Sequence, residues 1–218
     1  MWKGVIDIIY RSVYNGIVDE KVNVKETIIT KALELFSAKG YEGVSVSELT
    51  EAAGITKPTL YYYFGNKEGV FESVCQLYYA QLNAVVAENA VYNPHLRSYY
   101  EDIHLTLTRL ANAYFSFALK NGFFFRLVLT NMSMPGSSAV FNIVKKYHFT
   151  QFEIIETMFA TMAKRHGNLK GKSNTLTWSF IGTINAYISL YFSGVPGQTL
   201  NDKAVHDLVH QFMHGIYS

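Results

Sequence analysis

Signals for two helices and a tight turn follow one another in residues 45–64, and this order constrains the fold more than any other feature of the chain. Ser45 and Glu48 have the spacing of a capping box, in which each side chain bonds the other residue's backbone N–H at a helix start. Gly54 ends that helix, because glycine adopts the left-handed backbone found at helix C-termini. Thr56 then caps a second helix. The sequence therefore predicts a helix-turn-helix.

The second helix of the pair has an apolar side and a polar side. Leu60 and Phe64 lie four residues apart, so both are expected to face the first helix. The opposite arc carries one cation, one threonine and three phenols: Lys57, Thr59, Tyr61, Tyr62 and Tyr63. Such side chains suit the floor and walls of a DNA major groove. The same pattern also fits an ordinary amphipathic helix in an all-α protein.

A third helix is expected to begin after Asn66, whose side chain can cap it. Its first N–H groups and Lys67 are placed to hold one DNA phosphate. Pro58 is tolerated in the first turn of the preceding helix, because the N–H that it lacks has no intrahelical partner there. The DNA contacts that we predict are Ser45, Ser47, Lys57, Pro58, Thr59, Tyr61, Tyr62, Tyr63 and Lys67.

Residues 24–75 carry a run of motifs with a recognisable order. The motifs are Gly54-Ile55-Thr56, Pro58-Thr59-Leu60-Tyr61, Tyr63-Phe64 and Asn66-Lys67-Glu68, preceded by Ala32, Phe36, Gly40, Tyr41 and Val46. This run resembles the DNA-binding module of the tetracycline-repressor (TetR) family of bacterial transcription regulators. It departs from the family pattern at Leu49-Thr50, where Ile-Ala is usual, and at Gly69, where a better helix former is usual. Neither departure touches a predicted DNA-facing position.

The resemblance implies a function and a mechanism. It implies a dimer that binds palindromic operator DNA, and an effector whose binding in the C-terminal domain shifts the two DNA modules apart through a long helix. We therefore expect a ligand-responsive transcriptional regulator of the cytoplasm, a repressor released by a small hydrophobic effector. The alternative is a helical small-molecule- or metal-binding protein without DNA-binding activity.

Helical periodicity runs along the chain without strand-like alternation of any length. The predicted fold class is all-α, with an N-terminal three-helix DNA-binding domain and a larger helical domain for ligand binding and dimerisation. The predicted divisions are an extension of unknown role at 1–22, the helix-turn-helix domain at 23–83, with its motif at 45–64, and the regulatory domain at 84–218. Other expected helices are 25–39, 67–90, 96–120, 123–130, 138–165, 174–192 and 202–216, with a turn at 134–136.

The predicted DNA module lacks a basic excess. Residues 1–75 contain eight Lys and Arg against ten Asp and Glu. This balance opposes DNA binding, because phosphate neutralisation usually dominates the affinity. A local arrangement resolves the conflict if the lysines face phosphates while the carboxylates of Glu48, Glu51 and Glu72 lie on other faces.

Residues 173–201 carry no charged side chain, which raises the question of a membrane span. Polar Thr, Ser and Asn side chains are scattered through this segment, so we expect a partner subunit, and not a membrane, to cover it. The resemblance agrees, since it implies dimerisation through the last two long helices, about 174–193 and 202–216. The single Cys75 excludes an intramolecular disulfide and is expected to be buried and inert in a reducing cytosol.

Aromatic residues are dense between the two ends of the chain, with a few polar residues among them. Apolar walls with a few convergent polar groups describe an effector pocket, and they equally describe an ordinary core. The pocket residues that we predict are Tyr100, His104, Phe115, Phe125, Phe152, Trp178 and Asn185.

The histidines near the C-terminus are close to a metal motif. His206, Asp207 and His210 form HDLVH, and His214 follows on the same helical face. Aspartate is shorter than the glutamate that activates water in HExxH sites, and three imidazoles on one straight helix cannot converge on one ion. We therefore expect no catalytic residue, no metal site and no cofactor, and leave open an incidental or dimer-bridging metal.

Overall fold

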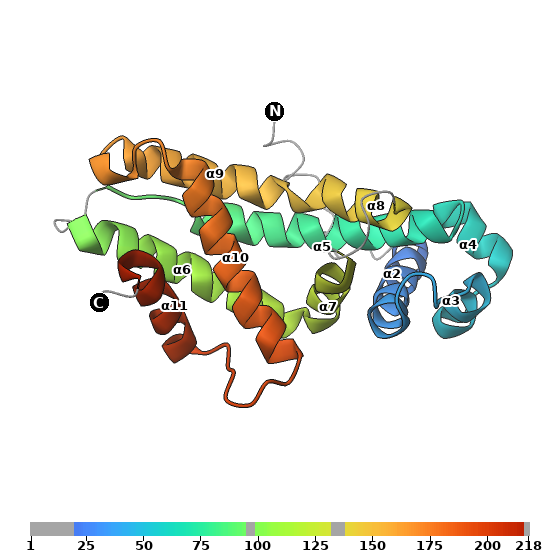
Figure 1. Cartoon of the computed structure of the whole chain (residues 1–218). Helices are drawn as coiled ribbons and strands as arrows, with labels where there is room; N and C mark the ends of the chain where they lie inside the picture. The colour runs from blue at the N-terminus through green and yellow to red at the C-terminus, as the bar shows by residue number, and fades with distance from the viewer. Residues whose placement is uncertain (1–19, 95–98, 132–137, 216–218) are drawn as a thin grey trace.

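The computed structural model describes residues 20–94, 99–131 and 138–215, and this part of the chain is all-α (Figure 1). Helices α2, α3 and α4 form a small module at one end, and the long helix α5 runs from it through the rest of the molecule. The helices are α2 (Glu20–Lys39), α3 (Val46–Ala53), α4 (Lys57–Phe64), α5 (Lys67–Asn89), α6 (Tyr99–Lys120), α7 (Gly122–Asn131), α8 (Ala139–His148), α9 (Thr150–Ala163), the 3-10 helix η1 (Gly167–Leu169), α10 (Ser173–Phe192) and α11 (Asp202–His214).

The module packs around the start of α5. Ile28, Ala32 and Phe36 of α2 are buried, and the Phe36 ring meets Phe71 of α5 edge to face at 5.3 Å between centroids. Helix α2 begins at Glu20, before the predicted start at 25, and Val24 packs against the core one turn before Ile28. The predicted boundary at 22 therefore falls inside a helix, and the remainder of the predicted extension lies outside the described residues.

Helix α5 is the central helix of the body and joins it to the module. It packs against α2 in the module and against α6, α8 and α9 in the body, and α10 and α11 lie over α9 and α6 (Figure 1). Cys75 on α5 is fully buried, and burial raises the pKa of its thiol to about 12, which keeps it in the unreactive protonated form. None of the described helices combines the length and the apolarity that crossing a membrane requires.

The prediction of one helix over 138–165 is wrong, because α8 and α9 are separate helices that meet at Phe149. The side-chain amide of Gln151 donates to the carbonyl of His148 at 3.0 Å, and the Phe152 N–H bonds the Phe149 carbonyl three residues back. The side-chain bond from Gln151 therefore lies where the backbone ladder of α8 ends and that of α9 begins.

Other predicted helices agree with the structure within the described residues. Helix α5 ends at Asn89 and α10 covers Ser173–Phe192, close to the predicted bounds. Helix α6 is seen from Tyr99, and α11 ends at His214, where Gly215 has a φ of 67°. The predicted first residues of α6, the turn at 134–136 and the last predicted residue of α11 lie outside the described residues.

Candidate nucleic-acid interface and effector cavity

The turn motif is held by hydrogen bonds between residues close in sequence. The Ser45 N–H donates to Glu48 Oε2 at 2.8 Å and the Glu48 N–H donates to Ser45 Oγ at 3.2 Å, which completes the predicted capping box. Gly54 takes the left-handed conformation with a φ of 65°, and its N–H donates to Glu51 O. Thr56 caps α4 by accepting from the Thr59 N–H. The chain therefore turns sharply between α3 and α4 as the sequence predicts.

Helix α4 buries one side and exposes the other. Leu60 is fully buried and Phe64 packs at the edge of the core. Tyr61 and Tyr62 are 48% and 75% exposed, and the Tyr62 ring meets the Tyr63 ring edge to face at 5.1 Å between centroids. The other predicted contacts divide into exposed Ser45, Ser47, Lys57 and Pro58 and partly buried Thr59, Tyr63 and Lys67.

Lys67 has a structural task that the sequence does not indicate. Its ammonium donates to the carbonyls of Tyr41 at 3.0 Å and Val44 at 3.1 Å, and lies 4.1 Å from the centre of the Tyr41 ring. These bonds hold the loop before α3 against the start of α5. An ammonium has three N–H donors, so one remains for a phosphate oxygen. Asn66 caps α5 beside it by accepting from the Gly69 N–H at 2.7 Å.

Two carboxylates of the module accept hydrogen bonds from lysine and other groups within the protein. Glu48 bonds Lys39 at 2.7 Å as well as the cap, and the Lys39 hydrogen bond is the main cause that lowers the pKa of Glu48 to about 2. Glu72 accepts from Lys146 at 2.6 Å and from the Tyr147 hydroxyl at 2.9 Å. The acidic balance of the module is therefore partly neutralised locally, while Lys57 stays exposed.

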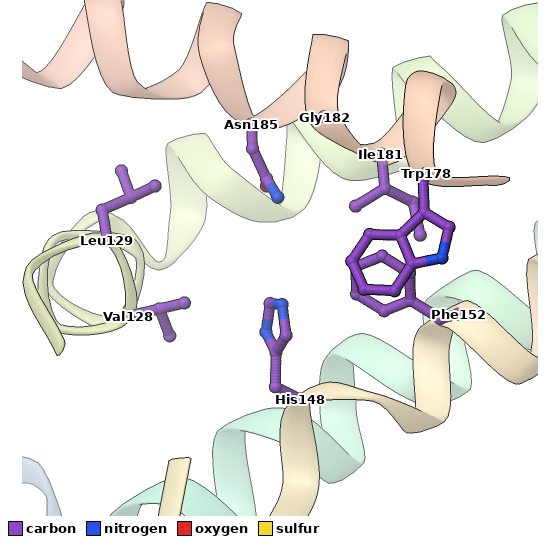
Figure 2. Close-up of a pocket in the computed structure, with 8 residues that line it drawn as sticks. All are labelled: Val128, Leu129, His148, Phe152, Trp178, Ile181, Gly182 and Asn185. Carbon is purple, nitrogen blue, oxygen red and sulfur yellow. The ribbon is translucent and has the colours of Figure 1, made fainter. Parts of the chain in front are cut away.

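A cavity of 220 Å³ lies in the body between α7, the junction of α8 and α9, and α10 (Figure 2). Trp178 and Phe152 form one wall, with their ring centroids 4.4 Å apart. His148 at the end of α8 and Asn185 on α10 point toward one another across the space. The lining residues are Val128, Leu129, His148, Phe152, Trp178, Ile181, Gly182 and Asn185.

His148 belongs to a buried hydrogen-bond network behind the cavity. Its Nδ1 lies 3.0 Å from the Tyr79 hydroxyl on α5 and 3.3 Å from Gln151 Nε2. The Gln151 carbonyl oxygen accepts from the Tyr114 hydroxyl at 2.6 Å. Burial lowers the pKa of His148 to about 4 and raises the pKa values of both tyrosines. All these groups are therefore uncharged near neutral pH.

The module matches the description "Bacterial regulatory proteins, tetR family" over residues 28–74. Residues 28–74 therefore belong to a module of the TetR family. Among curated relatives, the biofilm-operon regulator IcaR of Staphylococcus aureus is 33% identical over 66 residues, 30% of this chain and 36% of its own. The repressor ComR of Escherichia coli K12 is 32% identical over 136 residues, 60% of this chain and 61% of its own. The chain thus spans less than two thirds of either relative.

Solved structures with the same fold cover more of this chain. A Clostridium perfringens putative fatty acid metabolism regulator aligns with a TM-score of 0.72 at 20% identity, over 87% of this chain and 98% of its own. FadR of Bacillus subtilis, in complex with stearoyl-CoA, gives 0.70 at 18% identity over 88% and 98%. AibR, in complex with isovaleryl coenzyme A and operator DNA, gives 0.64 at 17% identity over 86% and 97%. At these identities the likeness concerns the fold.

The cavity gathers some of the predicted pocket residues and omits others. Phe152, Trp178 and Asn185 line it. Phe115 and Phe125 are buried elsewhere in the core, where Phe115 meets Tyr187 and Phe125 meets Phe117 and Phe124. His104 lies close enough to the α11 histidines for them to affect its pKa, which burial chiefly lowers. The side chain of Tyr100 lies outside the described residues.

The polar centre of the cavity was missed. His148 and Gln151 stand three residues apart in an aromatic stretch, which is also common in ordinary cores, and this spacing was the only local signal. On α11, the rings of His206 and His210 are 5.8 Å apart and those of His210 and His214 are 4.8 Å apart. Among the residues that the structure describes, no group of three or more His, Cys, Asp or Glu is placed to hold a metal ion.

Proposed function

We propose that this chain is a dimeric, ligand-responsive DNA-binding transcriptional regulator, a repressor that binds a palindromic operator in the cytoplasm and is released by a small hydrophobic effector. The observation that carries the proposal is the face of α4 that exposes tyrosine and lysine side chains. A capped turn holds α4 in place, and the continuous helix α5 follows it. FadR and AibR, which share the fold, are described in complex with acyl-CoA ligands, and AibR also with operator DNA.

The DNA-binding surface that we propose consists of α4 and the starts of α3 and α5. Tyr61, Tyr62 and Lys57 would enter the major groove, where phenols and ammonium groups bond base edges and phosphates. Ser45 and Ser47 at the start of α3 and Lys67 at the start of α5 would hold the flanking phosphates. These helix starts also contribute their unpaired N–H groups, which favour an anion.

Two contacts join the proposed effector cavity to the DNA module. Helix α7, which carries Val128 and Leu129 of the cavity wall, packs against α2. Helix α8, which carries His148, packs against α5, and its Lys146 bonds Glu72 near the module. A ligand that moves α7 or α8 would therefore change the tilt of the DNA module relative to the body, because α7 contacts α2 and α8 contacts α5.

The homodimer that we propose forms through α10 and α11. Helix α10 carries no Lys, Arg, Asp or Glu, although one of its sides is exposed in the single chain. A helix without charge on its exposed side is typical of an interface. The exposed positions include Thr175, Trp178, Ser179, Gly182, Ala186 and Leu190.

Selection of bound sequences from a random pool of DNA duplexes, followed by fluorescence anisotropy on the selected duplex, tests the function. We expect a palindrome whose half-sites lie about one helical turn, ~34 Å, apart. Lys57→Ala and Tyr61→Ala should each cost about 1–3 kcal/mol of binding free energy. Lys170→Ala, an equal charge change directly after η1, which packs on α9, is the control and should leave affinity unchanged. No enrichment at low salt would refute the proposal.

Light scattering of two arginine variants tests the dimer. Ala186→Arg places a charge on the exposed side of α10 and should convert the dimer to a monomer. Ala160→Arg makes the same change on the exposed side of α9 and should leave the mass unchanged. A dimer that survives Ala186→Arg with full stability would assign the interface to another surface.

A further inference from the structure

We propose that the cavity takes a compact, uncharged ligand whose carbonyl oxygen accepts the Nε2–H of His148, and that His148 transmits ligand binding to α5 through Tyr79. This inference rests on the proposed function and names the ligand class and the coupling residues of the same site.

The tautomer of His148 follows from the hydrogen bonds of Gln151. The Gln151 side-chain nitrogen lies 3.0 Å from the His148 carbonyl oxygen, which can only accept, so the amide NH₂ must face it. The same NH₂ lies 3.3 Å from His148 Nδ1. Nδ1 is therefore the acceptor, and the Tyr79 hydroxyl at 3.0 Å also donates to it. In a neutral imidazole the proton must then be on Nε2.

The Nε2–H of His148 is directed away from this network toward the cavity. The imidazole is neutral because burial lowers its pKa to about 4. Nε2 makes no hydrogen bond within the described part of the chain, whereas Nδ1 has two donors. Figure 2 shows the ring reaching into the space toward Asn185. A donor that lines an apolar cavity has few other acceptors there, so a ligand oxygen at this position would be favoured.

The residues that line the cavity limit the charge, polarity and size of the ligand. No Lys, Arg, Asp or Glu is among the lining residues, so a carboxylate or phosphate would lose its hydration without gaining a countercharge. Asn185 offers a second polar contact, and the other walls are hydrocarbon or aromatic. The volume of 220 Å³ is below the ~300–1,000 Å³ of pockets for drug-sized molecules. A small ketone, ester or lactone with an apolar body fits these limits.

The residue that we propose for the coupling is Tyr79, which lies on α5, the helix that joins the DNA module to the body. Tyr79 lies on α5, in the same helix as Lys67 and Glu72. Its hydroxyl bonds His148 at Nδ1, the ring nitrogen other than the proposed donor Nε2. A ligand bonded to Nε2 would shift the ring and, with it, the bond that joins α8 to α5. Tyr79 is therefore a positioning residue that senses the ligand through His148.

Three isosteric probes test the ligand class: acetophenone with a carbonyl, cumene without one, and benzoate with a negative charge. The chain has two tryptophans, so Trp2→Phe leaves Trp178 in the cavity wall as the fluorescent reporter. We expect acetophenone to bind about tenfold tighter than cumene. Benzoate should bind more weakly than either. Equal affinity for acetophenone and cumene, or tighter binding of benzoate, would overturn the ligand class.

His148→Phe keeps an aromatic ring in place and removes the donor. The variant should bind cumene as the parent does and lose the preference for acetophenone. Asn185→Leu provides a second test at the opposite wall, and should keep most of that preference because His148 remains. If His148→Phe is folded by circular dichroism and still prefers acetophenone tenfold, the donor has been assigned to the wrong group.

Tyr79→Phe tests the coupling. It should bind acetophenone as tightly as the parent but need about tenfold more ligand to release the selected operator. Tyr191→Phe on α10, whose hydroxyl has no hydrogen-bond partner among the described residues, is the control and should release the operator normally. Unchanged release in Tyr79→Phe would overturn the coupling. If no duplex is bound at all, the proposed function fails, and the probe titrations still decide the ligand class.

Discussion

The DNA module and the body of the molecule are organised by hydrogen bonds of different range. In the module, Ser45 bonds Glu48 and Thr56 bonds Thr59, each pair three residues apart. In the body, Tyr79 reaches His148 across 69 positions. Local bonds can form within a single stretch of chain, whereas the body's network exists only when four helices are already packed. The module is therefore the part of the fold that its own sequence specifies most directly.

The difference also separates the roles of polar groups. In the module they stand at helix ends and leave a polar face toward solvent. In the body they are buried, uncharged and dependent on one another, so the loss of one leaves another without a partner. Substitutions should therefore act locally in the module and spread through the network in the body.

Lowering the pH should give the largest change in the free energy of unfolding, and the group responsible, His148, lies in the body. The pKa of His148 is about 4 in the folded protein against an ordinary 6.5, so the unfolded chain binds the extra proton between these values. Stability is then complete above pH 6.5 and falls as the pH approaches 4, by about 3 kcal/mol in total. Urea unfolding at pH 7 and pH 5 should show a loss of about 2 kcal/mol.

His148→Phe is the matched control for the acid experiment. The variant lacks the titrating group, so its stability should change much less between pH 7 and pH 5. An equal loss in both proteins would mean that other groups cause the acid sensitivity and that His148 does not titrate as a buried imidazole.

Tyr114→Phe should have the next largest effect. The change removes the donor to Gln151 Oε1 at 2.6 Å and leaves that oxygen buried without a partner. The free energy of unfolding should fall by about 2 kcal/mol. Tyr191→Phe should change it by less than about 0.5 kcal/mol, since no hydrogen bond of its hydroxyl is lost among the described residues. Similar losses in both variants would argue against a tightly coupled network.

The same contrast explains what could be predicted from the sequence. Caps and turns fixed the helices of the module, because Ser45, Gly54 and Thr56 act on their own neighbours. The break at Phe149 was missed, because it depends on a side-chain bond from Gln151 that helical periodicity does not record. The apolar spacing is the same for a residue buried within one continuous helix and for a residue buried where two helices meet.

The candidate sites show the same division. The exposed face of α4 follows from periodicity alone, and Tyr61 and Tyr62 are exposed as expected. The cavity unites α7, α8, α9 and α10, whose pairing is set by tertiary packing, and of the predicted pocket residues Phe152, Trp178 and Asn185 line it. The bond from Lys67 to Tyr41 likewise spans 26 positions and has no local signal.

Removal of the α3 cap should have a smaller and local effect. Ser45→Ala removes the acceptor of the Glu48 N–H and should lower stability by about 1 kcal/mol. Hydrogen exchange should quicken in α3 and stay unchanged in α9. Ser47→Ala, inside the same helix and without a capping bond, should leave both rates unchanged. Faster exchange throughout the body would show that the module is not an independent local unit.

The smallest expected effect belongs to the ion pair that links the two regions at the surface. Lys146 donates to Glu72 at 2.6 Å, and this bond is the main cause that lowers the pKa of the carboxyl group. The pair is well exposed, so solvent and salt screen it. Lys146→Ala should lower the thermal midpoint less than Ser45→Ala does, and the difference from the parent should vanish in ~1 M NaCl. Lys145→Ala, the exposed neighbour without an ion pair among the described residues, is the control for lost charge. A large loss that persists in salt would mean that the stem of Lys146 packs α8 against α5, and that the module depends on the body more than its local hydrogen bonds indicate.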